Sequence, residues 1–256
     1  MAIKISSIKK KQYEIDGYFI LESIIPADHL ELLQSECQHA VDQVHAEMDR
    51  QGTDILGINH RGNRYFCGQP SCAHPSLKAF IFSDLMAEIC RATIGNHAYF
   101  HNDQYVVKKG QPGMKSGMKF SWHQDSAYVQ AKVGKHPEHI TCWCALDDMT
   151  DKNGTTYILP ISRYGNRKLA DHVTEKKSND RVGYFGNDPG DPVIVPSGSI
   201  AVFSSLTFHR SGPNVTGRER RAYLTQYSPA PIVNAPGAHP QYYAEPFLVD
   251  GTSVVA

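Results

Sequence analysis

The sequence has no excess of charge, no long hydrophobic run and no cysteine pattern of a known zinc module. Lysine plus arginine and aspartate plus glutamate each number 26 in 256 residues, so the net charge is zero. Nothing in this balance points to nucleic acid or to an acidic membrane surface as a partner. The amino terminus MAIKISSIKKK is basic, but no apolar run of signal-peptide length follows it, and no later segment is long enough to span a bilayer.

The cysteine usage and the absence of repeats limit the architecture further. With no export signal, reduced thiols and a cytoplasmic location are expected for the six cysteines, which are Cys37, Cys67, Cys72, Cys90, Cys142 and Cys144. There is no internal repeat and no low-complexity linker. A hydrophobic content of 41 % and a charged content of 20 % are ordinary for a soluble globular protein. We therefore expect a single domain over residues 1–256.

Hydrophobic periodicity predicts two regions of different texture. Residues 1–95 read as mostly helical support with a short strand, because 27–50 and 76–93 repeat apolar residues at helical spacing and 17–26 is rich in strand formers. Residues 96–230 alternate strand-like runs with glycine and proline turns, which predicts a mainly β antiparallel sandwich or barrel. The expected strands are 98–107, 120–128, 139–149, 155–160, 191–196, 199–209 and 221–229. The polar segment 170–191 lacks periodicity and is expected to be an exposed insertion or lid.

The stretch SWHQD, residues 121–125, places an imidazole and a carboxylate two positions apart. In a strand, His123 and Asp125 would point to the same face and could bind one divalent metal ion. Two ligands bind weakly, so a third is expected, and His209 is the best candidate because it ends an apolar strand before a glycine turn. Two histidines and one carboxylate form the facial set of non-haem Fe(II) oxygenases, which leaves coordination positions open.

Arg220 follows His209 by eleven positions, with a turn-like stretch between them. We interpret this stretch as a hairpin, which would fold Arg220 back beside His209. Ser211 shares the face of His209 by strand parity. A guanidinium beside a hydroxyl is a good receptor for a carboxylate, so a 2-oxo diacid would bridge the metal and Arg220.

These residues lie in motifs that resemble the phytanoyl-CoA dioxygenase family of Fe(II)/2-oxoglutarate oxygenases. The motifs are WHQDSAY, ALDDMTDKNGTTYILPISR and FHRSGPNVTGRERRAYLTQYSP, and the resemblance runs from about Gln12 to Pro229. It implies a double-stranded β-helix, a cupin-like jelly-roll barrel with helices on one side. It also implies Fe(II), 2-oxoglutarate and O2 as cofactors and cosubstrates, with succinate and CO2 released as the small-molecule substrate is hydroxylated.

The resemblance assigns roles to individual residues. It makes His123, Asp125 and His209 the iron ligands and Arg220 the partner of the distal carboxylate of 2-oxoglutarate. Further cosubstrate contacts are expected from Ser211, Thr156, Trp143, Gln104 and Lys108. Expected contacts to the substrate are His101, Arg61, Arg64 and Tyr128, where either arginine could recognise an anionic group.

Two other functions are compatible with a metal-binding jelly roll. The first is a cupin-like isomerase or binding protein without oxidative activity, against which Arg220 argues because such a protein needs no clamp for 2-oxoglutarate. The second is a hydroxylase of protein side chains, against which the short chain argues. A free small molecule is preferred as the substrate, while acyl-CoA, a small phosphonate and an amino acid stay open. Desaturation, epoxidation and cyclisation also stay open, and halogenation is disfavoured because Asp125 is a carboxylate. The sequence gives no oligomeric state.

Overall fold

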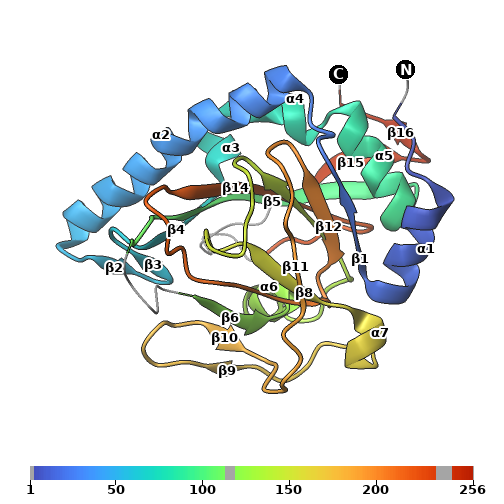
Figure 1. The fold of residues 1–256 in the computed structure, drawn as a ribbon. Coiled ribbons are helices and arrows are strands. Elements are labelled where there is room, and N and C mark those ends of the chain that lie inside the picture. The colour runs from blue at the N-terminus through green and yellow to red at the C-terminus, as the bar shows by residue number, and fades with distance from the viewer. Residues whose placement is uncertain (1–2, 113–118, 235–243, 256) are drawn as a thin grey trace.

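A computed structural model describes residues 3–112, 119–234 and 244–255 and shows two antiparallel sheets that face each other (Figure 1). The large sheet has ten strands in the order β1-β12-β7-β14-β5-β4-β3-β2, with β15 pairing to β5 and β16 to β15. Its strands are β1 Tyr18–Leu21, β2 Ile55–Leu56, β3 Asn59–His60, β4 Arg64–Gly68, β5 Ala98–Lys108, β7 Ile140–Ala145, β12 Ile200–Ser204, β14 Arg220–Ser228, β15 Glu245–Val249 and β16 Thr252–Ser253. The small sheet has the order β11-β8-β13-β6, with β6 Phe120–His123, β8 Thr156–Leu159, β11 Asp191–Pro192 and β13 Phe208–Ser211. This arrangement confirms the predicted jelly-roll barrel.

Helices cover the outer face of the large sheet (Figure 1). The long helix α2 buries one stripe, which includes Leu33 and Cys37, and the hydroxyl of Tyr105 on β5 donates a hydrogen bond to the Leu33 carbonyl at 2.9 Å. The helical elements are α1 Ser7–Asp16, α2 Ala27–Gln51, α3 Pro70–Ala73, the 3₁₀ turn η1 Pro75–Leu77, α4 Lys78–Ile81, α5 Asp84–Thr93, α6 Asp125–Val133 and α7 Ile161–Tyr164. The predicted helix at 27–50 is therefore confirmed. No helix among the described residues combines the length and the apolar character needed to cross a membrane.

The core has two layers because the large sheet is buried on both faces. One layer fills the space between the helices and the outer face of the sheet. The other lies between the two sheets and joins Val106, Trp143 and Leu224 of the large sheet to Ile158 of the small sheet. Burial on both faces accounts for the continuous apolar runs in β7 and β12, where every residue is buried.

Several predicted elements are divided in the structure. The helix expected over 76–93 breaks at Phe82–Ser83, because Ser83 caps a new helix by accepting a hydrogen bond from the Met86 amide at 3.4 Å. The strand expected over 199–209 becomes β12 and β13, which belong to different sheets. The strand expected over 120–128 ends at His123, and α6 begins at Asp125.

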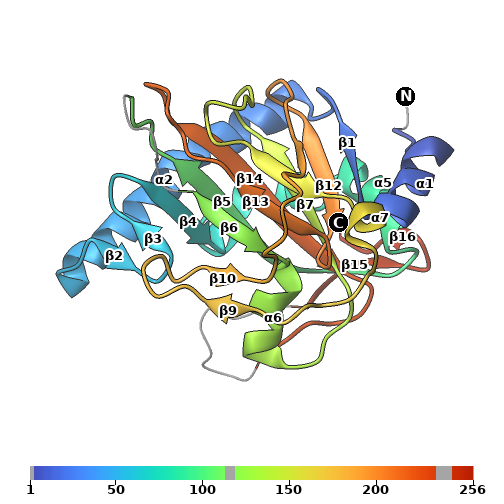
Figure 2. The same ribbon diagram turned by 60° about the horizontal axis from the view of Figure 1, so that its bottom comes forward.

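The segment 170–191 contains a two-stranded hairpin, β9 Val173–Thr174 and β10 Arg181–Val182. Figure 2 shows this hairpin beside β6 and α6, at the edge of the small sheet. It is tied to α6 by the Arg181 amide, which donates to the hydroxyl of Tyr128 at 3.0 Å. The insertion is therefore fixed against α6 and the edge strand β6 of the small sheet.

Candidate active site

His123 and His209 face each other across neighbouring strands of the small sheet. They are direct partners in the antiparallel register of β6 and β13, and their ring centroids lie 4.1 Å apart. The Nδ1 atom of His123 contacts the Ser121 carbonyl at 2.8 Å, and that of His209 contacts the Thr207 carbonyl at 3.1 Å. These contacts fix Nδ1–H as the donor in both rings and leave both Nε2 atoms available to a metal ion.

Asp125 completes the group from the first residue of α6. Its Oδ1 atom lies 3.7 Å from His123 Nε2 and 3.4 Å from His209 Nε2, and ligand atoms of the three residues lie within 4.8 Å of one another. The strand-parity argument for Asp125 is wrong, because the chain turns into a helix after His123. The turn nevertheless brings the carboxylate to the same point.

The second oxygen of Asp125 is held by two side chains of the large sheet. Oδ2 accepts hydrogen bonds from Thr141 Oγ1 at 2.5 Å and from Gln226 Nε2 at 3.2 Å. Gln226 in turn accepts from Asn102 Nδ2 at 3.0 Å. Because Oδ2 is occupied in this way, Oδ1 is the oxygen presented to a metal ion.

The protonation states suit metal ligation. Burial and the neighbouring His209 lower the pKa of His123 to about 3, so its imidazole is neutral at physiological pH. Burial opposes the ionisation of Asp125, but His209, His123 and the hydrogen bond from Thr141 together bring its pKa below the ordinary value. A neutral imidazole and an ionised carboxylate are the forms that bind Fe(II), so these residues fit the metal that the motif predicts.

Arg220 is fully buried at the start of β14 and lines the same cavity as the three ligand residues. Its Nη2 atom donates to the Gly154 carbonyl at 2.6 Å and Nη1 to the Val106 carbonyl at 3.4 Å, while its Nε atom has no hydrogen-bond partner among the described residues. Burial lowers the pKa of Arg220 to about 10, so the group stays charged. A buried guanidinium with no carboxylate beside it in the described chain calls for an anionic ligand.

The route by which Arg220 reaches the cavity differs from the predicted hairpin. His209 lies on β13 of the small sheet and Arg220 on β14 of the large sheet, and the two strands do not pair. The connection crosses from one sheet to the other, so the two side chains reach the cavity from opposite walls. The eleven-residue spacing is thus accommodated by a crossover and not by strand pairing.

Most of the other expected cosubstrate contacts also line this cavity. Ser211 on β13 and Thr156 on β8 are partners in the strand register, and both line the cavity. The ring centroid of Trp143, which also lines the cavity, lies 5.7 Å from the guanidinium carbon of Arg220. Gln104 lines the cavity from β5. Lys108 does not line it, because its ammonium donates to the Gly212 carbonyl in the buried turn beside β14.

The cavity has a volume of about 180 Å³, and its lining is mainly apolar. Tyr128 lines it as expected, with its ring edge-on to His123 at 5.5 Å between centroids. Further wall residues are Ile58, Phe66, Phe120, Val129, Lys132 and Leu224.

The three other expected substrate contacts lie outside the cavity lining. His101 is fully buried at an irregularity in the β5–β14 pairing and packs against His139, with ring centroids 4.9 Å apart. Arg61 is engaged by Asp49 and Asp54 at 2.5 and 2.7 Å. Neither residue lines the cavity, so their contact to a substrate stays a prediction.

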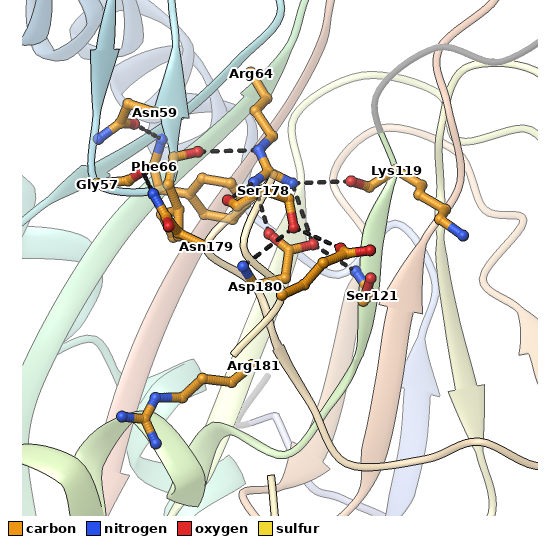
Figure 3. A network of polar contacts seen from close by, with 12 residues as sticks. Gly57, Asn59, Arg64, Phe66, Lys119, Ser121, Ser178, Asn179, Asp180 and Arg181 are labelled. Carbon is orange, nitrogen blue, oxygen red and sulfur yellow. Dashed lines mark hydrogen bonds and ion pairs between the residues drawn. The ribbon is translucent and has the colours of Figure 1, made fainter. Parts of the chain in front are cut away.

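Arg64 is at the centre of a buried polar network (Figure 3). Its guanidinium donates to Asp180 Oδ1 at 2.6 Å and Oδ2 at 3.4 Å, and to the carbonyls of Ile58, Lys119 and Ser178 at 3.0, 2.9 and 2.9 Å. All of its N–H groups have partners, so none is left for a substrate.

Thr141, Gln226 and Asn102 are part of the site, although no role was predicted for them. Each is a common polar residue on a strand, and Gln226 lies 101 positions from Asp125. Only the pairing of β14 with β7 and β5 brings them together. No local pattern identifies such residues.

Comparison with known proteins agrees with this geometry. The profile of the family described as phytanoyl-CoA dioxygenase (PhyH) matches residues 13–222. The chain is 26 % identical to the multifunctional dioxygenase ausE of Penicillium brasilianum over 83 % of this chain and 68 % of that protein. It is 24 % identical to a probable alpha-ketoglutarate-dependent hypophosphite dioxygenase of Stutzerimonas stutzeri, over 96 % of this chain and 87 % of that protein.

Solved structures share the fold. EvdO2 from Micromonospora carbonacea var. aurantiaca, solved in complex with 2-oxoglutarate, superposes with a TM-score of 0.68 at 20 % identity and covers 94 % of this chain and 97 % of that one. With the family profile matching most of the sequence, the chain belongs to the phytanoyl-CoA dioxygenase family of iron- and 2-oxoglutarate-dependent oxygenases.

Proposed function

We propose that His123, Asp125 and His209 bind Fe(II), that Arg220 binds the distal carboxylate of 2-oxoglutarate, and that the enzyme hydroxylates an unactivated C–H bond of a small organic acid. The observation that carries the proposal is one cavity that holds both the three-ligand group and a buried arginine with a free Nε–H. Iron and 2-oxoglutarate, when bound, supply the activation of O2, with release of succinate and CO2.

The protein contributes position and exclusion of water. The carbonyl contacts at both Nδ1 atoms, and the contacts of Thr141 and Gln226 with Asp125, orient the three ligands before any metal binds. Ser211 and Thr156 place hydroxyl groups in the same cavity as Arg220, where they supplement its binding of a carboxylate. The apolar walls formed by Phe66, Phe120 and Val129 exclude water from the reacting carbon.

The cavity lining supports a substrate with an apolar body and an anionic end. Asp125, Tyr128 and Lys132 are spaced by about one helical turn along α6 and all line the cavity. Seven residues of helix span about 10 Å, so Lys132 lines the cavity at that order of distance along α6 from Asp125. Arg181 lies beside this end of α6, with its guanidinium carbon 5.9 Å from the Tyr128 ring centroid.

The names of several relatives support the same class of substrate. They include the hypophosphite dioxygenase, an L-proline trans-4-hydroxylase of Streptomyces griseoviridis, a methylphosphonate hydroxylase of Gimesia maris and an ectoine dioxygenase of Bordetella bronchiseptica. Each named substrate is small and carries an acidic group.

A succinate-release screen tests both parts of the proposal. The protein is loaded with Fe(II) and 2-oxoglutarate under anaerobic conditions, mixed with O2, and offered small carboxylic and phosphonic acids, each paired with its uncharged amide or ester. Turnover should require Fe(II), should be lost in His209→Ala, and should favour the acid of a pair. Turnover without added iron would contradict the metal assignment, whereas equal turnover of acid and amide would contradict only the anionic substrate class.

A further inference from the structure

A second group of metal-ligating side chains lies outside the cavity, on the exposed side of α2. The Oε2 atom of Glu36 contacts His39 Nδ1 at 3.1 Å and His74 Nδ1 at 2.9 Å. Ligand atoms of these three residues lie within 4.8 Å of one another, as they do in the His123–Asp125–His209 group. We propose that Glu36, His39 and His74 form a second divalent-metal site, selective for Zn²⁺ and similar transition-metal ions.

Backbone structure fixes the three residues in place. Glu36 and His39 are separated by three positions on α2 and therefore lie on one face of the helix. Their neighbour Cys37 is buried in the core, which sets the rotation of this face. His74 ends α3 and begins η1, and its backbone amide donates to the Pro70 carbonyl at 2.8 Å. The site would therefore join two separate helical segments.

Two imidazole nitrogens lie within hydrogen-bond distance of one carboxylate oxygen of Glu36. Both imidazoles turn Nδ1 toward the same carboxylate oxygen, and their rings are nearly parallel, with centroids 5.5 Å apart at an interplanar angle of 12°. Zinc bonds of about 2.0–2.1 Å in a tetrahedral site place neighbouring ligand atoms roughly 3.3 Å apart. The observed 2.9 and 3.1 Å need only a small expansion to admit the ion.

The donor set determines the class of metal. Two imidazole nitrogens and one carboxylate oxygen suit Zn²⁺, Co²⁺, Ni²⁺ or Cu²⁺, whereas Ca²⁺ and Mg²⁺ prefer oxygen ligands. The side chains of Glu36 and His74 are only 18 % and 22 % exposed, so the charge of the ion is partly shielded from water. The same surface hollow is also lined by Asp42 and Gln43, and water would complete the coordination.

Zinc stoichiometry of the metal-free full-length protein tests the site. Equilibrium dialysis against Zn²⁺ should give two ions per chain, one in the cavity and one at Glu36–His39–His74. His39→Ala, at an exposed position that should leave the fold intact, and His74→Ala should each remove one ion. His97→Ala is the matched control, because this exposed histidine forms an ion pair with Asp250 and lies outside both groups of ligand residues, so its loss should leave the count at two. An unchanged count in both His39→Ala and His74→Ala would refute the second site.

A spectroscopic experiment separates the two sites. In the His209→Ala background, one equivalent of Zn²⁺ should shift the imidazole NMR signals of His39 and His74, and Glu36→Gln should weaken this binding at least tenfold. If Zn²⁺ leaves both histidine signals in place, the second site does not exist, whatever the cavity binds. If instead His209→Ala does not reduce the zinc count, the proposed iron site is contradicted and the second site is not.

Discussion

Replacing Asp180 by asparagine should destabilise the protein strongly, although Asp180 is no part of the proposed catalytic group. Asp180 is 1 % exposed and is the only carboxylate that pairs with Arg64 among the described residues. Arg64 lies on β4 of the large sheet, and Asp180 also accepts a hydrogen bond from the Ser121 amide of β6 at 2.9 Å. Asp180 thus connects both sheets to the hairpin of β9 and β10 (Figure 3).

The magnitude follows from the burial of both partners. Asparagine keeps the shape of the side chain but leaves the Arg64 charge buried without a counter-charge, which costs about 3–5 kcal/mol of unfolding free energy. For a chain of this size, each kcal/mol corresponds to roughly 2–4 °C in Tm, so Tm should fall by about 6–20 °C. The substitution should also displace Arg181, the next residue. The backbone amide of Arg181 donates a hydrogen bond to the hydroxyl of Tyr128.

Thermal and urea unfolding followed by circular dichroism measure the effect. Asp171→Asn is the matched control, because this aspartate is an exposed residue of the same insertion and its substitution should change stability by less than about 0.5 kcal/mol. The double variant Arg64→Met with Asp180→Leu should recover part of the loss, since no buried charge remains unpaired. A loss below about 1 kcal/mol in Asp180→Asn, or one equal to that of Asp171→Asn, would refute the reasoning.

Three further predictions address the cavity and the core. Arg220→Gln should raise the KM for 2-oxoglutarate by roughly 10- to 100-fold and spare Fe(II) binding, because a charge-assisted contact of about 1.5–3 kcal/mol is lost; steady-state kinetics and metal dialysis measure the two effects, and an unchanged KM would contradict the clamp. Gln226→Leu should weaken Fe(II) or Mn²⁺ binding by about 10- to 100-fold, since Asp125 Oδ2 loses one hydrogen-bond donor. Asn102→Leu should have a smaller effect, because Asn102 donates to Gln226. Equal effects of the two substitutions would contradict the role assigned to Gln226. Burial raises the pKa of Asp103 to about 6, although hydrogen bonds from Tyr223 and Ser71 oppose this rise. Ionisation of Asp103 should therefore cost up to about 3 kcal/mol of unfolding free energy as the pH rises from about 4 to 6. Urea unfolding across this range should show the loss in the wild type and not in Asp103→Asn.

The sequence predicted which residues form the site more reliably than it predicted the secondary structure and strand pairing that bring them together. The motif around His123 and Asp125, the later His209 and the spacing to Arg220 named four residues that line one cavity. Two of the structural arguments used for them were wrong, because Asp125 begins a helix and Arg220 belongs to the other sheet. Local spacing limits how far apart two residues can lie, but it does not determine whether the chain between them turns back or crosses over.

Charge raises the same difficulty for the arginines. The sequence alone does not distinguish Arg61, Arg64 and Arg220, since an unpaired guanidinium at any of these positions would suit an anionic ligand. Their roles depend on carboxylates brought by folding: Asp49 and Asp54 engage Arg61, Asp180 engages Arg64, and no described carboxylate pairs with Arg220. Asp180 lies 116 positions from Arg64, so no local window includes the pair. A buried cation is free to bind a ligand only when the fold has left it without an internal anion, and that condition depends on the pairing of both sheets with the insertion.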